Sequence, residues 1–582
     1  MAWRTDSPGI SLGLIAAGLL LAALGVTIAL RRPVGREESA GSPAPAATAL
    51  IWFDEVAAES GIDFQHVSGQ AEKRYFPEIM SGGVGLIDYD RDGHLDVYFV
   101  QGGRVVGPPP DRPGNRLYRN LGNGRFADVT AQAGVGDKGY GMGCACGDFD
   151  NDGWTDIYVT NVGPSLLYRN NGDGTFSDVT DRAGVGDPSF GSSAAFTDYD
   201  HDGDLDLFVV NYTRWSAQTE IECFAPNGRL DYCGPTNYQQ PAPDTLYRNE
   251  GDGTFTNVTR SAGIAAAFGN GLGIVATDLD GDGWTDFAVA NDLMANQLWI
   301  NNRDGTFREE GLVRGMAYNG EGFAESGMGI DAQDIDDDGD SEVFMTHFDG
   351  LTNTLYINDG GLFDDRTSHY GLMGSLPFTG FGTALIDLNN DGLLDIYVAN
   401  GRVAGGDAGA GEEKRYSELN QLFEGLGDHT FREVFPRGGT QDPLVHSSRG
   451  AAFGDYDNDG DVDIFVVNRD APAYVLNNRG SPVNHWTMFR VVNHHGADAI
   501  GARVQIEVDG HKRFRDVRTG YSYCASNDPR VHFGLGTVSR VDGVEVRWVD
   551  GTVQRFGSFT ADQIVELKRS KSAGGTRGRS SR

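Results

Sequence analysis

Short runs in which apolar and polar residues alternate recur seven times along the chain. They read DVYFVQ, DIYVTN, DLFVVN, DFAVAN, EVFMTH, DIYVAN and DIFVVN, and each begins with an acidic residue. Val, Ile, Phe and Tyr at a spacing of two are typical of β-strands, because successive strand side chains point to opposite faces. The pattern predicts one equivalent strand in each copy of an internal repeat.

A second phrase follows this strand. Its clearest copies are NRLYRNLGNGRFADVT (115–130), SLLYRNNGDGTFSDVT (165–180) and DTLYRNEGDGTFTNVT (244–259). Asn-Gly and Asp-Gly pairs between apolar runs predict hairpin turns. Together with a Gly-rich strand ahead of each acidic residue, every repeat supplies about four short antiparallel strands, the composition of a propeller blade.

The last repeat lacks one strand. It contains AYVLNN (473–478) but no Phe-x-Asp-Val-Thr segment, and a matching piece, WFDEV (52–56), precedes the first repeat. We therefore predict that the N-terminal strand completes the last blade. The fold class predicted is all-β, with a seven-bladed β-propeller over residues 50–480.

An acidic loop of the form D-x-D-x-D-G-x-x-D precedes each alternating strand. Carboxylates at positions 1, 3, 5 and 9 of one tight turn repel one another, so the loop is costly without a cation. Oxygen ligands in a flexible, high-coordination arrangement favour Ca²⁺ over Mg²⁺. The glycine at position 6 permits the sharp turn, and the carbonyl of position 7 would add a ligand. We predict up to seven Ca²⁺ ions.

The predicted metal ligands are the residues at positions 1, 3, 5 and 9 of the seven loops. They are Asp88, Asp90, Asp92 and Asp96; Asp148, Asp150, Asp152 and Asp156; Asp198, Asp200, Asp202 and Asp206; Asp278, Asp280, Asp282 and Asp286; Asp334, Asp336, Asp338 and Glu342; Asp387, Asn389, Asp391 and Asp395; Asp455, Asp457, Asp459 and Asp463. Glu342 and Asn389 depart from the pattern, so we expect the fifth and sixth loops to bind most weakly.

An EF-hand shares the D-x-D-x-D-G pattern but needs a bidentate Glu at position 12 and flanking helices. Position 12 is apolar in all seven loops and falls within the alternating run. The sequence therefore excludes an EF-hand.

Acidic residues outnumber basic ones by 83 to 47, which gives a formal charge of −36. Such a surface repels nucleic acid and anionic membranes, so we expect no nucleic-acid partner.

Residues 9–30 form an uncharged apolar run long enough to cross a bilayer as a helix. We predict a signal anchor or signal peptide over 1–32, and the length of the run favours an anchor. More Arg follows the run than precedes it, which taken alone places the large domain inside the cell; the calcium loops outweigh this. We expect an extracytoplasmic protein tethered by a Pro/Ala/Ser-rich linker (33–49), or a secreted or periplasmic one after cleavage, with no other membrane contact.

Five cysteines are too few to stabilise a chain of this size. Cys223 and Cys233 lie ten residues apart in an insertion, and we predict a disulfide between them in an exported protein. Cys144 and Cys146 are interpreted as small packing residues.

The loop, strand and Gly-Asp-Gly turn together resemble the FG-GAP/VCBS calcium-loop repeats of integrin α-subunit propellers. Residues 484–566 contain IGARVQIEV, GYSY, HFGLG and VEVRW, and this small β domain resembles the ASPIC/UnbV domain of the cartilage acidic protein family. Cys524 and Val549 depart from that resemblance, where an aliphatic residue and a Pro are common. Residues 568–582 form a basic, Ser/Gly-rich tail that we expect to be disordered.

Three functions are compatible with these features, and the fold does not choose among them. We expect a non-catalytic binding or adhesion module that recognises a protein or glycan. The alternatives are a carbohydrate lyase or hydrolase with its site in the propeller channel, and a scaffold that recruits a partner through the C-terminal domain. The sequence holds no P-loop, Gly-x-Ser-x-Gly elbow or His-Glu-x-x-His motif.

Two structural features would separate these functions. An enzyme should place titratable side chains together in the channel, whereas a binding module should expose aromatic residues on one face or on the insertion. The aromatic residues of the insertion favour binding, with the covering of a neighbouring blade as their alternative role. They are Tyr212, Trp215, Phe224, Tyr232 and Tyr238.

Overall fold

The structure is a computed structural model that describes residues 51–107, 112–405 and 414–570, all within one compact unit. The chain is almost entirely β-structure in these ranges. The helical elements are single turns: α1 (Ala57–Ser60), α2 (Thr130–Ala133), α3 (Thr180–Ala183), α4 (Gly311–Arg314), and the 3-10 turns η1 (Phe76–Ile79), η3 (Pro235–Asn237), η4 (Ile264–Ala266), η5 (Leu372–Ser375) and η7 (Arg437–Gly439). The predicted signal segment and linker, and residues 571–582 of the predicted tail, lie outside the described residues.

Seven antiparallel sheets account for most of the chain up to residue 478. In chain order they are β2 (Val84–Ile87), β3 (Asp96–Phe99), β4 (Arg116–Asn120) and β5 (Phe126–Asp128); β6 (Gly141–Gly147), β7 (Asp156–Asn161), β8 (Gly163–Asn170) and β9 (Phe176–Asp178); β10 (Gly191–Thr197), β11 (Asp206–Asn211), β14 (Thr245–Asn249) and β15 (Phe255–Asn257); β16 (Gly271–Thr277), β17 (Asp286–Asn291), β18 (Gln297–Asn301) and β19 (Phe307–Glu309); β20 (Ile330–Gln333), β21 (Glu342–Met345), β22 (Thr354–Asn358) and β23 (Phe363–Asp365); β24 (Gly380–Ile386), β25 (Asp395–Asn400), β27 (Gln421–Gly425) and β28 (Phe431–Glu433); and β30 (Ser448–Gly454), β31 (Asp463–Asn468), β32 (Tyr474–Asn478) and β1 (Phe53–Glu55).

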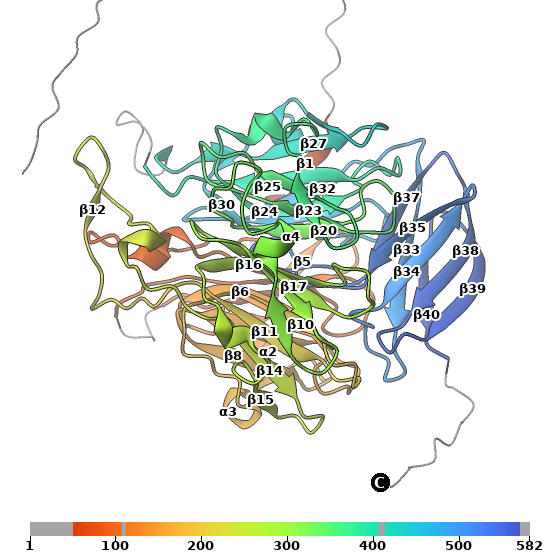
Figure 1. Cartoon of the computed structure of the whole chain (residues 1–582), viewed down its shortest axis with the longest axis horizontal. Helices are drawn as coiled ribbons and strands as arrows, with labels where there is room; N and C mark the ends of the chain where they lie inside the picture. Colours follow the sequence, from red (N-terminus) through yellow and green to blue (C-terminus); the bar gives the residue numbers. More distant parts are fainter. Residues whose placement is uncertain (1–50, 108–111, 406–413, 571–582) are drawn as a thin grey trace, which may run out of the picture. The chain divides into compact units, whose positions relative to one another are not determined.

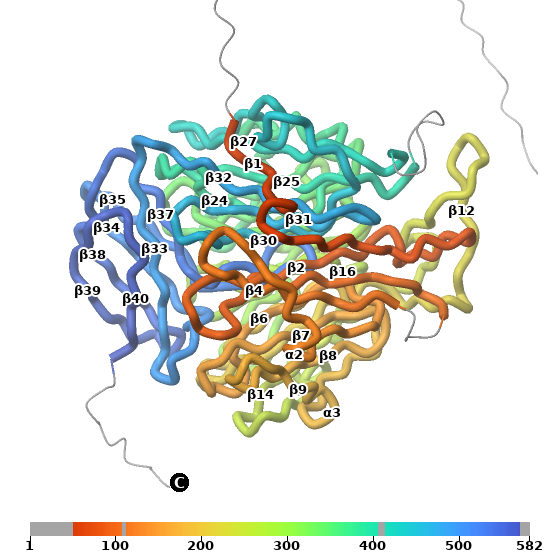
Figure 2. Tube along the Cα trace, turned by 180° about the vertical axis from the view of Figure 1, so that it is seen from behind, coloured from red at the N-terminus to blue at the C-terminus, as the bar shows by residue number. Residues whose placement is uncertain are grey.

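The first strands of successive sheets lie side by side in a closed order (Figures 1 and 2). Strand β2 contacts β6, and the contacts continue through β10, β16, β20, β24 and β30 back to β2. A separate core of buried apolar side chains fills each space between neighbouring sheets; Val97 of the first sheet, for example, packs with Phe465 and Val475 of the last. The arrangement is propeller-like.

The predicted closure of the last sheet is confirmed. Strand β1 pairs antiparallel with β32, with Phe53 opposite Asn478 and Glu55 opposite Leu476. The Trp52 N–H also donates to the Gly439 carbonyl over 2.8 Å. The N-terminal strand therefore joins the two ends of the repeat array.

The C-terminal part forms two sheets with their own apolar core. The strands are β37 (Val531–Gly536), β33 (His485–Val492) and β40 (Ile564–Lys568) in one sheet, and β35 (His511–Asp516), β34 (Arg503–Val508), β38 (Arg540–Arg547) and β39 (Val553–Thr560) in the other. Phe489, Ile506 and Val546 are among the side chains buried in this core.

The segment between β35 and β37 leaves these sheets and runs among the first strands of the ring. Strand β36 (Ala525–Ser526) pairs in parallel with β2. Ser522 exchanges backbone hydrogen bonds with Ile330 of the fifth sheet, and the Cys524 N–H donates to Ser193 Oγ of the third over 2.9 Å. Residues 522–528 are all buried. The C-terminal segment therefore fills the centre of the ring, which local sequence patterns do not predict.

The Gly-rich first strands make room for this segment. A Cβ atom on Gly143 would lie 2.8 Å from the Cys524 Cα, and one on Gly83 would lie 2.4 Å from the Cys524 carbonyl oxygen. Real Cβ contacts are longer, so glycine is required where two backbones approach this closely.

At one end of the central segment, an aromatic cluster packs over the ring. Phe76 of η1, Tyr212 and Tyr232 join the buried cluster that holds Tyr523 and Cys524. The insertion that carries Tyr232 also contains the hairpin of β12 (Cys223–Phe224) and β13 (Leu230–Asp231). A second short pair, β26 (Glu418–Leu419) with β29 (Val445–His446), lies beside the sixth sheet. Tyr212 and Tyr232 therefore cover the ring, which is the alternative role expected for the aromatic residues of the insertion.

Candidate metal centres

All seven acidic loops fold in the same way. The N–H of the position 6 glycine donates to the position 1 carboxylate over 2.8–3.3 Å in every loop. The N–H of position 7 donates to the position 5 carboxylate over 2.8–3.0 Å. The position 6 glycines have φ between 87° and 105°, a region that side chains disfavour, so the predicted role of this glycine is confirmed.

The position 9 carboxylate stands at the start of the second strand of each sheet and is buried. One of its oxygens accepts from the N–H of position 2 over 2.9–3.2 Å in all seven loops. Position 12 lies in the same buried strand, as expected from the exclusion of an EF-hand.

The loops bring carboxylate oxygens of several positions together. In the first, second, third and fifth loops, oxygens of positions 1, 3 and 9 lie within 4.8 Å of one another, and in the fourth loop those of positions 1, 3 and 5 do. In the seventh loop Asp455, Asp457 and Asp459 all act electrostatically on Asp463. In the sixth, Asp387 and Asp391 act on Asp395 in the same way.

Several buried carboxylate oxygens in the first five loops have no hydrogen-bond partner. They are Oδ1 of Asp88, Asp90, Asp150, Asp200, Asp278, Asp280, Asp334 and Asp336, and Oε1 of Glu342. Asp334 is 2% exposed and Glu342 is fully buried. An unpartnered buried polar atom costs about 1–3 kcal/mol, and more when it is charged. A hard cation would satisfy these oxygens, and oxygen donors of this kind fit Ca²⁺.

Without a cation the carboxyls of Asp148, Asp156 and Asp198 have raised pKa values and hold their protons more tightly than usual. Burial, followed by repulsion from Asp150 and Asp152, raises the pKa of Asp148 to about 7. Burial likewise raises the pKa of Asp198 to about 7 and places that of the position 9 residue Asp156 well above its ordinary value. The geometry therefore gathers negative charge where water cannot solvate it.

The two loops expected to bind weakly differ from the others. In the other six loops the second oxygen of position 9 accepts an N–H from the third strand of the sheet, whereas Glu342 Oε1 has no such partner. In the sixth loop Asn389 Nδ2 donates to Asp391 Oδ2 over 3.1 Å. An amide hydrogen bond thus stands where other loops have a carboxylate oxygen. The weaker calcium binding expected of the fifth and sixth loops stays a prediction.

Arginines of the C-terminal domain reach the acidic loops. Arg547 Nη2 lies 3.1 Å from Asp278 Oδ2, Arg513 Nε lies 3.3 Å from Asp337 Oδ2, and Arg530 Nη2 donates to the Asp455 carbonyl. Sequence reasoning missed these contacts. The one available signal concerned Arg513, which lies two residues from Arg515 and therefore shares a strand face with it.

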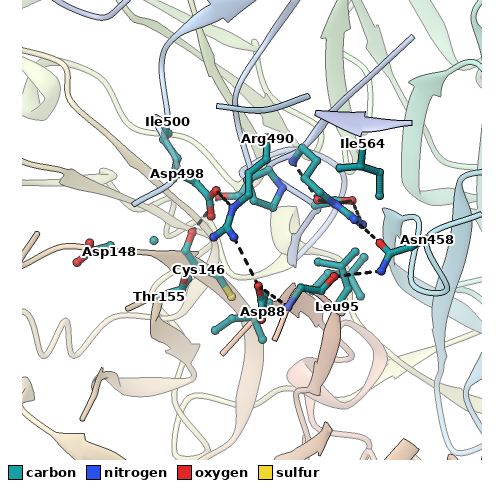
Figure 3. Close-up of a pocket in the computed structure, with 18 residues that line it drawn as sticks. Asp88, Leu95, Cys146, Asp148, Thr155, Asn458, Arg490, Asp498, Ile500 and Ile564 are labelled. Carbon is teal, nitrogen blue, oxygen red and sulfur yellow. Dashed lines mark hydrogen bonds and ion pairs between the residues drawn. The ribbon is translucent and has the colours of Figure 1, made fainter. Parts of the chain in front are cut away.

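A cavity of about 220 Å³ lies where the first two loops meet the C-terminal strands (Figure 3). Arg490 stands between two carboxylates there, with Nε 2.9 Å from Asp498 Oδ1 and Nη1 3.8 Å from Asp88 Oδ2. Ile500 and Ile564 contribute apolar surface. Because Arg490 pairs with carboxylates from both sides, this cavity belongs to the contact between loops and C-terminal strands.

A larger groove of about 800 Å³ lies beside the insertion. Trp215 and Tyr238 line it half-buried, and both are held by Glu220: the indole Nε1 donates to Oε2 over 2.9 Å, and the tyrosine hydroxyl donates to Oε1 over 2.6 Å. Phe224 is 60% exposed on the hairpin. The insertion thus divides its aromatic residues between covering the ring and lining a groove.

The cysteines behave as expected. Cys223 and Cys233 form a disulfide, and the thiols Cys144, Cys146 and Cys524 are buried and unbonded. Among the residues described, no helix has both the length and the apolar composition needed to cross a bilayer. The apolar run of residues 9–30 lies outside those residues.

Family comparisons agree with the repeats and with the C-terminal strands. The FG-GAP-like repeat family matches residues 88–159, 148–209, 226–289, 278–345 and 334–398, and the ASPIC and UnbV family matches residues 493–574. Cartilage acidic protein 1 of Xenopus tropicalis is 24% identical over 491 residues, covering 81% of this chain and 61% of that protein. The Mus musculus protein is 24% identical over 510 residues, with 83% and 64% covered.

This chain therefore spans less than two thirds of the length of these relatives. Among solved structures, the BP39L lectin from Burkholderia pseudomallei has a TM-score of 0.39 at 10% identity, covering 69% of this chain and 96% of the lectin. YCF48 bound to D1 peptide has a TM-score of 0.37 at 9% identity, covering 69% and 93%. The chain belongs to the FG-GAP-like repeat family, carries a C-terminal ASPIC and UnbV domain, and is homologous to cartilage acidic protein 1.

Proposed function

We propose that this protein is a calcium-loaded, seven-bladed propeller that acts outside the cytoplasm as a non-catalytic binding module. The observation that carries the calcium assignment is the set of unpartnered, buried carboxylate oxygens in the first five loops. Calcium ligation would satisfy these oxygens and hold the carboxylates ionised, which suits a structural role and not an acid–base one.

The count of seven blades rests on the seven sheets and their closed order. Each sheet repeats the same acidic loop between its first and second strands, so each blade would hold one ion. With seven ions the propeller would be crosslinked by metal at every blade.

The location outside the cytoplasm is supported by the disulfide and by the metal loops. Disulfides persist in oxidising compartments, and Cys223 and Cys233 are bonded in the insertion. Calcium loops of this type would fill where calcium is plentiful. The apolar run 9–30 would supply the membrane anchor of such a protein.

The groove beside the insertion is the surface we assign to ligand binding. Glu220 fixes the polar ends of Trp215 and Tyr238, so both rings are held rigid before a ligand arrives. Arg214 and Gln240 also line the groove. Rigid aromatic rings beside hydrogen-bonding groups suit a glycan or a protein side chain.

The central segment weighs against an enzyme with a channel site. Ser522 bonds to the fifth sheet and Cys524 to the third, and the segment around them is buried. A substrate would have to displace it. A scaffold role for the C-terminal domain is also disfavoured, because part of that domain is committed to the ring itself.

Calcium titration tests the central claim. The full chain is chelated and then titrated with Ca²⁺, with Mg²⁺ as the control, while bound ions and melting temperature are measured. Five to seven ions with a large rise in melting temperature are expected. Binding of one ion or none, with no change in stability, would refute the proposal.

The binding surface is tested by screening the calcium-loaded protein against arrays of glycans and of extracellular proteins. Trp215→Ala should abolish any specific signal, whereas Phe224→Ala alters an exposed aromatic residue of the same insertion outside the groove and should retain it. A specific signal that survives Trp215→Ala would place the ligand elsewhere.

A further inference from the structure

One position in the third strand of each sheet lies next to the residue that reaches the acidic loop of that sheet. It immediately precedes the residue whose N–H donates to the position 9 carboxylate, as Arg119 precedes Asn120 and Arg169 precedes Asn170. The same hydrogen bond identifies the equivalent residues Arg248, Ile300, Glu424 and Asn477. In the fifth sheet, which lacks this bond, the matching strand position is Ile357. The repeats therefore vary in charge at a fixed place beside the predicted metal.

In the first two loops an arginine at this position bridges two of the predicted ligands. Arg119 Nε lies 2.6 Å from Asp90 Oδ2, and its Nη2 lies 3.0 Å from Asp92 Oδ2. Arg169 pairs in the same way with Asp150 and with Asp152, the latter at 2.5 Å. Both arginines thus pair with the carboxylates at positions 3 and 5 of their own loop.

The third repeat has the arginine but not the bridge. Arg248 turns to Glu250 instead, with Nη2 2.7 Å from Oε1. This repeat offers a natural control, because the same residue at the same strand position makes no ion pair with its loop.

In the fourth loop other arginines make these contacts, Arg314 with Asp280 and Arg303 with Asp282. The last three loops hold no such cation at positions 3 and 5. Ile357, Glu424 and Asn477 stand at the fixed position, and Asn477 donates an amide hydrogen bond to Asp457 over 3.1 Å. Among the described residues, no ion pair joins Lys or Arg to position 3 or 5 of the fifth, sixth or seventh loop. Arginines of the C-terminal domain reach these loops at other positions, as Arg513 does at Asp337, so positions 3 and 5 keep no bridging cation.

We propose that Arg119 and Arg169 are tethered counter-ions that neutralise the first two loops when calcium is absent and lower the calcium affinity of these loops, making them exchangeable sites. This inference rests on the proposed calcium binding and adds a division of labour to it. The physical basis is competition: a guanidinium bonded to two of the ligand carboxylates must be released, or must endure repulsion, when a divalent cation enters.

Each arginine should oppose calcium binding but stabilise the metal-free protein. Each arginine offsets repulsion among partly buried carboxylates, so its loop keeps its fold without the ion. Replacing it should therefore tighten calcium binding and weaken the metal-free fold at the same time. A residue with a purely structural role would lower stability in both states and leave the affinity unchanged.

Arg169→Ile tests the inference, since isoleucine occupies this position naturally in the fourth and fifth repeats. The full-length protein is chelated, then titrated with Ca²⁺ by calorimetry, and its melting temperature is recorded with and without the ion. We expect one site to bind on the order of tenfold tighter, a lower melting temperature without calcium, and an unchanged one with calcium. Arg248→Ile is the matched control. It should change both the calcium affinity and the metal-free melting temperature much less than Arg169→Ile does.

Unchanged or weaker binding by Arg169→Ile would overturn the inference, as would an equal gain in Arg248→Ile. Arg169→Gln serves as the second variant, because a polar side chain of similar length lessens any packing defect; its affinity should also rise. Failure of the proposed function looks different: the parent protein itself would bind no calcium. If the parent protein binds calcium and both Arg169 variants keep its affinity, only the counter-ion inference is refuted and the proposed calcium binding stands.

Discussion

Arg518 and Asp331 form a buried ion pair, with Nη2 2.7 Å from Oδ1, that joins the C-terminal segment to the first strand of the fifth sheet. Asp331 is fully buried, and its carboxylate also accepts the N–H groups of Ala332 and Leu385. The pair thus connects two adjacent sheets of the ring to the segment that fills its centre.

Loss of one partner of this pair should be strongly destabilising. Arg518→Ala leaves a buried carboxylate without its cation, which typically costs about 3–5 kcal/mol of unfolding free energy. Chemical denaturation of the calcium-loaded protein measures it. Glu545→Ala removes one partner of the exposed pair with Arg555 and should cost less than about 1 kcal/mol. Equal losses in both variants would show that Arg518 does not anchor the segment.

The close approach of the two backbones at Cys524 gives a second prediction. Gly143→Ala places a Cβ atom 2.8 Å from both the Cys524 Cα and the Ser192 carbonyl oxygen. Because neither is the end of a flexible side chain, we expect a loss of about 1–3 kcal/mol. Gly427→Ala is the matched control, since its Cβ meets nothing within 4 Å. A Gly143→Ala protein as stable as the control would contradict the placement of the central segment.

The repeat made the sheets predictable from sequence. Each acidic loop fixed the start of a strand at Asp156 or its equivalent, and the unmatched WFDEV segment revealed the pairing of Phe53 with Asn478. These features are local or recur seven times, so a single chain displays them without any homologue. The disulfide between Cys223 and Cys233 was predictable for the same reason, being a short-range pairing in one insertion.

The central segment was not predictable. Residues 520–526 are small or aromatic and read as a loop of the C-terminal domain, because nothing local distinguishes a loop in solvent from one inserted among seven strands. Its partners, such as Ser193 and Ile330, are about 190–330 residues away in sequence. The arginine bridges of Arg119 and Arg169 were missed for a related reason: the repeated LYRN phrase read only as a strand.

The metal-free protein should lose stability as pH rises. Burial raises the pKa of Asp148 and Asp198 from 3.8 to about 7 in the fold. Between these values the folded state holds protons that the unfolded state releases, so unfolding free energy falls with rising pH and levels off above about 7.

Calcium should abolish this decline, because the bound ion keeps the carboxylates ionised. Melting temperatures at about pH 5.5 and 8, with chelator and with excess Ca²⁺, provide the test. We expect the chelated protein to melt lower at the higher pH, and the loaded protein to show no such loss. A chelated protein that is more stable at pH 8 would contradict the buried carboxylate clusters.

The sixth loop should respond to restoration of its missing carboxylate. Asn389→Asp replaces the amide that donates to Asp391 with a fourth acid, and the added charge should tighten calcium binding at that loop by roughly tenfold. The same change should lower the melting temperature of the chelated protein, because it adds repulsion beside Asp387 and Asp391. Calorimetric titration against the parent protein measures the first effect and thermal melting the second. If Asn389→Asp changes neither, the sixth loop does not use position 3 to hold the ion, and the predicted ligand set would have to exclude that residue.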